Sequence, residues 1–186
     1  MQADFKILID ACVLANIMVC DVFLRLAEKP RLFLPRWSSE ILEETRRVQS
    51  EKLNWPDALV KSWRREVERS FPDASVDDYG HLLEAMTNDK KDRHVLAAGV
   101  RAGAGVIVTC NLKDFPEEAL RPWGVEAVHP QDYLLTLYSM APEIVVLKLT
   151  QMARKRNRDF VDLLLMLGKT LPSFTAHLID DLGLEP

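Results

Sequence analysis

Short apolar segments alternate with longer segments of helical periodicity over roughly the first 130 residues of this chain. Segments this short and this rich in Ile, Leu and Val are typical of strands that are buried on both faces. The predicted strands are residues 5–10, 32–34, 106–109 and 125–128, with a weaker one at 74–76. Because helices separate the strands, the pattern predicts an α/β fold in which helices cover both faces of a parallel sheet.

The helices between these strands can also be placed from their ends. They are predicted at residues 13–28, in a segment capped by Ser38 or Ser39, in a segment beginning at 55–57, and at 80–86 and 89–102. Pro30 is expected to end the first helix, and Gly103 the last. Pro35 is expected to close the strand at 32–34, since proline lacks the N–H that a sheet requires.

The pattern changes after about residue 130, where only helical periodicity remains. Helices are predicted at 131–140, 143–155, 159–169 and 173–182, with Pro130, Pro142 and Pro172 marking starts. We therefore expect a domain at 1–135 and a C-terminal helical extension at 136–186. The apolar stripe of the extension is too extensive for a solvated linker, so the extension should pack on the domain.

Composition limits the classes of function that the chain can have. Its 186 residues are 48% hydrophobic and 28% charged, which suits a globular domain with a small appendage. The formal net charge is −4, so a basic footprint for nucleic acid is absent, and a polyanion would need local patches or a metal. The 3 cysteines are odd in number and form no CxxC, so we expect reduced, buried thiols and neither a disulfide framework nor a zinc site.

No part of the sequence indicates export or membrane insertion. The first residues lack the basic and apolar pattern of a signal peptide. No apolar run approaches the roughly 18 residues of a membrane span. We therefore expect a cytoplasmic protein without membrane contact.

Four groups of acidic residues follow the predicted strands or begin the predicted helices. Asp10 and Asp114 come directly behind strands, whereas Glu40, Glu43, Glu44, Asp89 and Asp92 lie at helix starts. The carboxyl ends of parallel strands form one crevice, and carboxylates gathered there would repel one another without a cation. Oxygen ligands suit Mg²⁺ or Mn²⁺, so the acids predict a divalent-metal site.

Each acid also has a simpler explanation when it is taken alone. Asp10 can cap the following helix, and Asp89 and Asp92 can favour a helix start through the helix dipole. Asp114 can belong to a turn, and the three glutamates can be surface residues. Glu40 and Glu44 are four residues apart and share a helix face, whereas Glu43 points elsewhere.

Four stretches of the sequence, which follow one another along the chain, contain these acids. They are residues 7–14, 38–44, 89–98 and 106–116, which read ILIDACVL, SSEILEE, DKKDRHVLAA and VIVTCNLKDFP. Together they resemble the PIN domain, and most closely the VapC-like ribonucleases of bacterial toxin–antitoxin pairs. The helical tail resembles the extension of a longer VapC-like subgroup. One departure is Cys12, where many relatives carry a polar residue.

The resemblance implies a three-layer α/β/α fold with a central parallel sheet and metal-dependent cleavage of RNA. It also implies a cognate antitoxin and a homodimer, for which the apolar helix 59–67 offers a surface. The implied catalytic and metal-binding residues are Asp10, Glu44, Asp92 and Asp114, with Asp89, Thr109, Asn111 and Glu40 in secondary positions. Glu40 or Glu43 would replace Glu44 if the helix register differs.

Two further predictions concern the substrate and the competing functions. Arg93, Lys90 and Lys91 are candidates for RNA contact, and His94 is expected on the helix surface. A catalytically silent PIN scaffold that binds RNA or protein is the main alternative. A phosphotransferase with Asp10 as nucleophile ranks last, since Cys12 stands where a second Asp would be needed.

Overall fold

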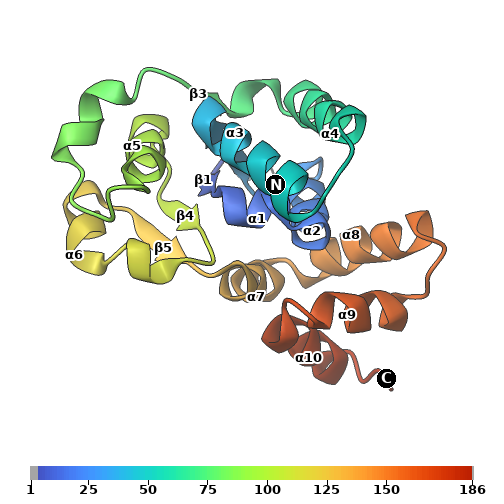
Figure 1. Cartoon of the computed structure of the whole chain (residues 1–186). Coiled ribbons are helices and arrows are strands. Elements are labelled where there is room, and N and C mark those ends of the chain that lie inside the picture. The colour runs from blue at the N-terminus through green and yellow to red at the C-terminus, as the bar shows by residue number, and fades with distance from the viewer. Residues whose placement is uncertain (1–3, 186) are drawn as a thin grey trace.

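The computed structural model describes residues 4–185 and contains one five-stranded sheet whose strands are all parallel (Figure 1). The strands are β1 (Lys6–Ile9), β2 (Leu34–Ser38), β3 (Ser75–Val76), β4 (Val106–Val108) and β5 (Glu126–Val128). The predicted parallel α/β class is therefore confirmed. Residues 1–3 and 186, which include part of the amino-terminal pattern and the outer ends of the predicted domains, lie outside the described residues.

The order of the strands places the ends of β1 and β4 at the centre of the sheet. That order is β3-β2-β1-β4-β5, so β2 and β3 lie on one side of β1, and β4 and β5 lie on the other. Ile9 pairs with Val108 in the parallel register of β1 and β4. Asp10 and Thr109 follow directly, at the point where ligands bind in open α/β sheets.

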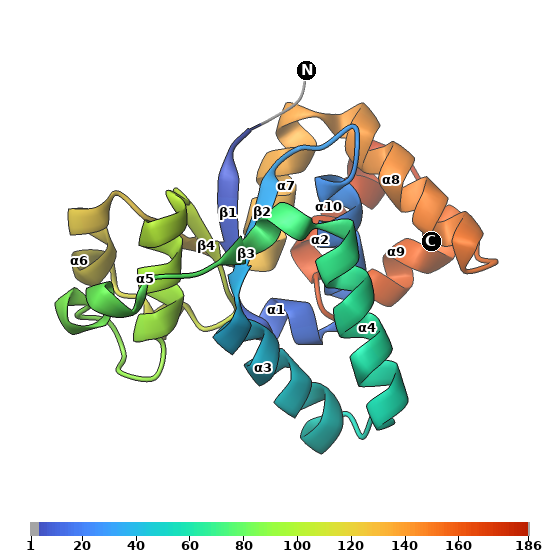
Figure 2. The same cartoon turned by 90° about the horizontal axis from the view of Figure 1, so that it is seen from above.

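Helices cover both faces of this sheet, as Figure 2 shows. On one side α5 (Arg93–Ala102) packs against the four strands β1 to β4, and α6 (Glu117–Leu120) lies beside it. On the other side lie α2 (Ile17–Ala27) and α7 (Pro130–Met140). Since β1 is covered on both faces, Ile7, Leu8 and Ile9 are completely buried.

The remaining helical segments complete the frame around the sheet. They are α1 (Ala11–Ala15), α3 (Ser39–Arg47), the π-helix η1 (Val48–Lys52), α4 (Asp57–Ser70), η2 (Pro72–Ala74), η3 (Gly80–Ala85), η4 (Leu112–Asp114), η5 (Arg121–Trp123), α8 (Pro142–Lys155), α9 (Phe160–Gly168) and α10 (Pro172–Asp181). The η segments other than η1 are short 3-10 helices, so the segment predicted as helical at 80–86 is one of these. Pro130, Pro142 and Pro172 each begin a helix, as predicted.

Two predicted boundaries near the amino terminus are wrong. The helix expected at 13–28 is two helices, because Asn16 ends α1 and its side chain then accepts a hydrogen bond from the Val19 N–H to cap α2. Pro35 lies inside β2 and does not end a strand. The backbone of Leu34 bonds toward β1, so that of Pro35 faces the other side, where β3 pairs only with Trp37 and Ser38. Proline is tolerated there because no neighbouring strand requires its N–H.

The helix expected at 89–102 begins later than predicted, at Arg93. Asp92 occupies the N-cap position, and residues before it form turns that lead from the end of η3. Gly103 ends the helix with a positive φ of 65°, which is the left-handed conformation expected of a glycine at that place. Asp89 thus lies on a loop, and Asp92 lies at the start of α5.

The C-terminal helices pack against the sheet domain. Val145, Leu149 and Met152 of α8 are buried, and α8 contacts α2. Two polar contacts reinforce this packing: Lys148 Nζ donates to the Lys29 carbonyl at 3.0 Å, and Arg156 pairs with Asp21 at 2.7 Å. The boundary between residues 135 and 136 stays a prediction, and α7 runs across it.

Within residues 4–185, no helix taken singly has both the length and the apolar character needed to cross a membrane. Only α7 and α8 taken together reach that length and composition, and they are bent by 119° where they meet.

The packing of α8 predicts unequal effects of two leucine substitutions on the same helix. Leu149→Ala should lower the free energy of unfolding by about 2–5 kcal/mol, because it removes a buried side chain that is 1% exposed. Leu147→Ala should change it by less than about 0.5 kcal/mol, since Leu147 is 46% exposed. Urea unfolding of both variants measures the difference, and equal effects would contradict the packing of the extension.

Candidate active site

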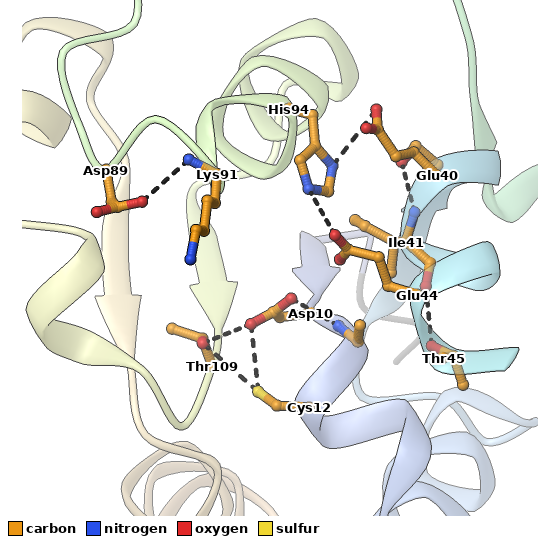
Figure 3. Close-up of polar contacts among 12 residues, drawn as sticks. Asp10, Cys12, Glu40, Ile41, Glu44, Thr45, Asp89, Lys91, His94 and Thr109 are labelled. Carbon is orange, nitrogen blue, oxygen red and sulfur yellow. Dashed lines mark hydrogen bonds and ion pairs between the residues drawn. The ribbon is translucent and has the colours of Figure 1, made fainter. Parts of the chain in front are cut away.

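Asp10 is held in place by both of its carboxylate oxygens. Oδ1 accepts a hydrogen bond from the Ala11 N–H at 2.6 Å, which caps α1. Oδ2 accepts from the Thr109 hydroxyl at 2.6 Å and from the Cys12 thiol at 3.2 Å (Figure 3). Although Asp10 is only 3% exposed, it lines an open cavity, so the helix-cap explanation and a functional role are compatible.

Thr109 links the end of β4 to both Asp10 and the following loop. Its buried hydroxyl donates to Asp10 and accepts from the backbone N–H of Asn111 at 3.1 Å. The side chain of Asn111 reaches the same cavity as Asp10. Both predicted secondary residues therefore lie where β4 meets this cavity.

Glu40 and Glu44 lie on one face of α3, with His94 between them, as Figure 3 shows. The His94 Nε2 atom is 3.4 Å from Oε1 of Glu44, and Nδ1 is 3.7 Å from Oε2 of Glu40. Burial lowers the pKa of His94, but attraction by Glu44 and Glu40 outweighs it, so the pKa is raised. The glutamates thus share a positively charged partner at pH values below that pKa.

The expected surface position of His94 is wrong, because its side chain is 7% exposed. The residues that follow it in α5, Val95, Leu96, Ala97 and Ala98, are also buried, so most of the circumference of this helix is covered. That near-continuous apolar run was the sequence signal that His94 would be buried as well.

Glu43 points away from this face, as the helix spacing predicted. It pairs with Arg46 at 2.7 Å and lies 4.0 Å from Arg64. The hydrogen bond from Arg46 lowers the pKa of Glu43. Of the three glutamates, only Glu44 lines the cavity with Asp10.

Among the predicted acids, Asp92 has a pKa that is clearly changed by its surroundings. Its pKa is raised to about 6, first by burial and then by the charges of Asp10, Asp114 and Asp89. Its side chain makes no cap hydrogen bond with α5, so the helix start alone does not account for its position. The charges of these three carboxylates thus add to the effect of burial on Asp92.

Asp89 and Asp114 are joined through the backbone. The Asp89 N–H donates to the Asp114 carbonyl at 3.2 Å, and the buried Asn88 amide reaches the same oxygen at 3.4 Å. Asn88 was not singled out from the sequence, where an Asn before an Asp in a turn is unremarkable. Its burial shows that it fastens the loop of Asp89 to η4.

A cavity of about 390 Å³ is lined by four of the predicted site residues, Asp10, Glu44, Asp92 and Asn111. Glu51, Arg47 and Lys52 also line it. Asp114 does not line it, so only three of the four predicted acids share its surface. A larger cavity of about 530 Å³ lies beside β5 and contains none of the four predicted acids, so its size does not mark it as the reactive site.

The donor set fits a hard divalent cation in its chemistry. Four acidic residues, Asp10, Glu44, Glu51 and Asp92, line one cavity. Burial and the nearby negative charges raise the pKa of Asp92, and a cation would relieve that repulsion. Among residues 4–185, however, no three His, Cys, Asp or Glu side chains are gathered closely enough to hold a metal. The four predicted acids therefore converge less closely than expected.

The positively charged side chains that line the cavity differ from those that the sequence suggested as RNA contacts. Arg47 and Lys52 line it from the end of α3 and from η1. Arg93 instead approaches the Asn88 carbonyl at 3.5 Å, while Lys90 and Lys91 are exposed on the loop that precedes α5. Arg47 and Lys52 follow Glu44 by three and eight residues, and residues at such spacings share a face of a helix. This spacing is the sequence signal that could have predicted them.

A known protein is similar to about half of this chain. The chain is 46% identical over 101 residues to the protein named "Putative ribonuclease VapC50" from Mycobacterium tuberculosis (strain ATCC 25618 / H37Rv). The resemblance to VapC-like ribonucleases is confirmed. The match covers 53% of this chain and 60% of the relative, which is less than two thirds of the relative's length.

The parallel α/β sheet with helices on both faces also fits a PIN domain, the fold expected of a VapC-like chain. No family model matches the sequence. No solved structure matches it either.

The raised pKa of Asp92 predicts how the stability of the protein depends on pH. Between its ordinary pKa of 3.8 and its folded pKa of about 6, the folded state binds more protons than the unfolded state. Without divalent cations, wild type should therefore lose stability as pH rises through this window. Asp92→Asn should remove that loss, and urea unfolding in EDTA at about pH 4 and about pH 7 measures it.

The matched control is Asp180→Asn, which removes an exposed carboxylate from α10 far along the chain. This variant should keep the pH dependence of wild type. If Asp92→Asn keeps it as well, Asp92 does not experience the repulsion inferred from its surroundings.

Proposed function

We propose that this chain is a Mg²⁺- or Mn²⁺-dependent endoribonuclease that acts as the toxin of a VapBC-type pair. The observation that supports this most directly is the cavity at the ends of β1 and β4, where Asp10, Glu44 and Asp92 face one space. The similarity to VapC50 supports the same class of activity. The cognate antitoxin, the homodimer and the cytoplasmic location are parts of this proposal.

Each acid has a distinct environment, which suits distinct tasks. When bound, a divalent cation would activate water and neutralise charge on the phosphodiester. Asp10 is immobilised by Ala11 and Thr109, so it provides a fixed carboxylate at the floor of the cavity. Glu44 is oriented by His94, and Asp92 holds a proton more readily than an ordinary aspartate.

The positive side chains of the cavity suit a polyanionic substrate. Arg47 and Lys52 are exposed and stand on the α3–η1 wall, opposite in charge to the acids. They would bind phosphates adjacent to the one that is cleaved, because a chain with a net charge of −4 needs local cations to hold RNA. Asn111 lines the cavity as well, and Asp114, Asp89, Thr109 and Glu40 would support the acids from outside its wall.

The homodimer would use the outer face of α4. Leu59 is 48% exposed there, and Trp63 is only partly buried. Such apolar residues on a helix surface are the kind that pair with a second copy.

The first test compares two neighbouring glutamates and Asp10 in cleavage of RNA. Glu44→Gln and Asp10→Asn should lower the rate by at least about a hundredfold, because each removes a negative charge that would hold the divalent cation in the cavity. Glu43→Gln should retain nearly full activity, since Glu43 pairs with Arg46 outside the cavity. A panel of structured RNAs with Mg²⁺, Mn²⁺ or EDTA measures these rates.

Full activity in EDTA, or an active Asp10→Asn protein, would remove the metal-nuclease proposal. Thermal unfolding provides a second readout, since Mg²⁺ should raise the melting temperature of wild type more than that of Asp10→Asn. If wild type neither cleaves any RNA nor gains stability from Mg²⁺, the catalytically silent scaffold becomes the better explanation.

The second test concerns binding of the substrate. Arg47→Ala should raise KM roughly three- to tenfold with little change in kcat, because the lost contact acts on a phosphate that does not react. The dependence of KM on salt should also become shallower. Arg46→Ala is the matched control, because it removes the same charge from α3 on the side of Glu43. Equal effects of the two substitutions would contradict a specific role for Arg47.

A further inference from the structure

Two cysteines from distant segments meet beside Asp10. Cys12 lies in the first turn of α1, and Cys110 follows Thr109 at the end of β4, 98 residues later. The backbone N–H of Cys110 donates to Sγ of Cys12 at 3.2 Å. Only Cα and Cβ separate that nitrogen from the sulfur of Cys110, so the two side chains are neighbours, and a disulfide would form by rotation about the Cα–Cβ bond of Cys110.

The two thiols differ in their access to solvent. Cys110 is exposed, whereas Cys12 is half-buried under the loop that carries Cys110. A small oxidant can therefore reach Cys110 first, and Cys12 is positioned to react next. The expectation of buried thiols holds for Cys20, which is 2% exposed, but it is wrong for Cys110.

We propose that Cys12 and Cys110 form a reversible disulfide when the protein meets hydrogen peroxide. The Cys110 thiol loses its proton and the thiolate attacks one peroxide oxygen. The O–O bond breaks, a sulfenic acid forms, and the departing hydroxide takes up a proton and leaves as water. The Cys12 sulfur then attacks the sulfenic sulfur, the S–S bond forms, the S–O bond breaks, and a second water leaves. The two sulfurs lose two electrons and two protons in total, and the peroxide is reduced to two waters.

This disulfide would act directly on the acid site. The Cys12 thiol donates to Oδ2 of Asp10 at 3.2 Å and lies 3.6 Å from the Thr109 hydroxyl. Oxidation removes that thiol hydrogen and ties the backbone between Thr109 and Asn111 to α1. The bond that holds Asp10 to β4 would be strained, so cleavage of RNA should stop until a thiol reductant restores the pair. This consequence rests on the proposed function, whereas formation of the disulfide does not.

The chemical test uses the purified full chain, first reduced and then treated with hydrogen peroxide. Intact mass should fall by two hydrogens, and peptide mapping without reductant should join Cys12 to Cys110. Cys20→Ser should give the same cross-link, because Cys20 takes no part in it. Cys110→Ser and Cys12→Ser should each lose the cross-link. Stable sulfinic acid at Cys110 without a cross-link, or cross-links only between two chains, would overturn the proposal.

The activity test compares oxidised and reduced protein on the same RNA panel. Oxidised wild type and oxidised Cys20→Ser should lose at least about tenfold in rate and recover it with dithiothreitol. Cys110→Ser should keep after peroxide whatever rate it had before. A cross-linked protein with an unchanged rate would overturn the regulatory role. A reduced wild type that cleaves no RNA would instead contradict the proposed function, while the mapped cross-link would still stand.

Discussion

The hydrogen bond from Thr109 to Asp10 joins the two strand ends on which the candidate site is built. It spans 2.6 Å between the residues that follow β4 and β1, and both residues are buried. A hydrogen bond to a charged carboxylate contributes about 1.5–3 kcal/mol, more than a neutral one. It therefore fixes a negative charge that would otherwise be costly to bury at the centre of the sheet.

The other acids are arranged around this fixed charge by separate elements. Glu44 comes from α3, and Asp92 comes from the start of α5, so the acids are brought together only by the packing of helices on the sheet. Burial first, and then the charges of Asp10, Asp114 and Asp89, raise the pKa of Asp92, whereas His94, which lies between Glu40 and Glu44, lowers it. A site of this kind stores unfavourable charge that a divalent cation can relieve, which links metal binding to stability.

The same strand ends also bring two sulfurs to the site. Cys12 contacts Asp10, Thr109 and Cys110, so any change at its sulfur is transmitted to the carboxylate through a single hydrogen bond. A redox response at this position would need no movement of a domain. It would require only that one donor to Asp10 be lost.

The sequence alone determined the class of fold and the position of Asp10 in it. Apolar strands alternating with helices indicated a parallel sheet, and Asp10 had to stand at the carboxyl end of β1 because it directly follows this buried strand. The spacing of Glu40, Glu43 and Glu44 separated the inward pair from the outward residue, since a helix has 3.6 residues per turn. These conclusions depend on local geometry, which neighbouring residues specify.

Tertiary structure decided what distant segments do to one another. Pro35 is accommodated inside β2 because β3 is too short to require its N–H, and His94 is buried because α3 covers that end of α5. The meeting of Cys12 with Cys110 depends on the pairing of β1 with β4. Neither the place of Pro35 nor the meeting of the two cysteines has a sequence pattern of its own, since each depends on the packing of the whole sheet and not on local chain geometry.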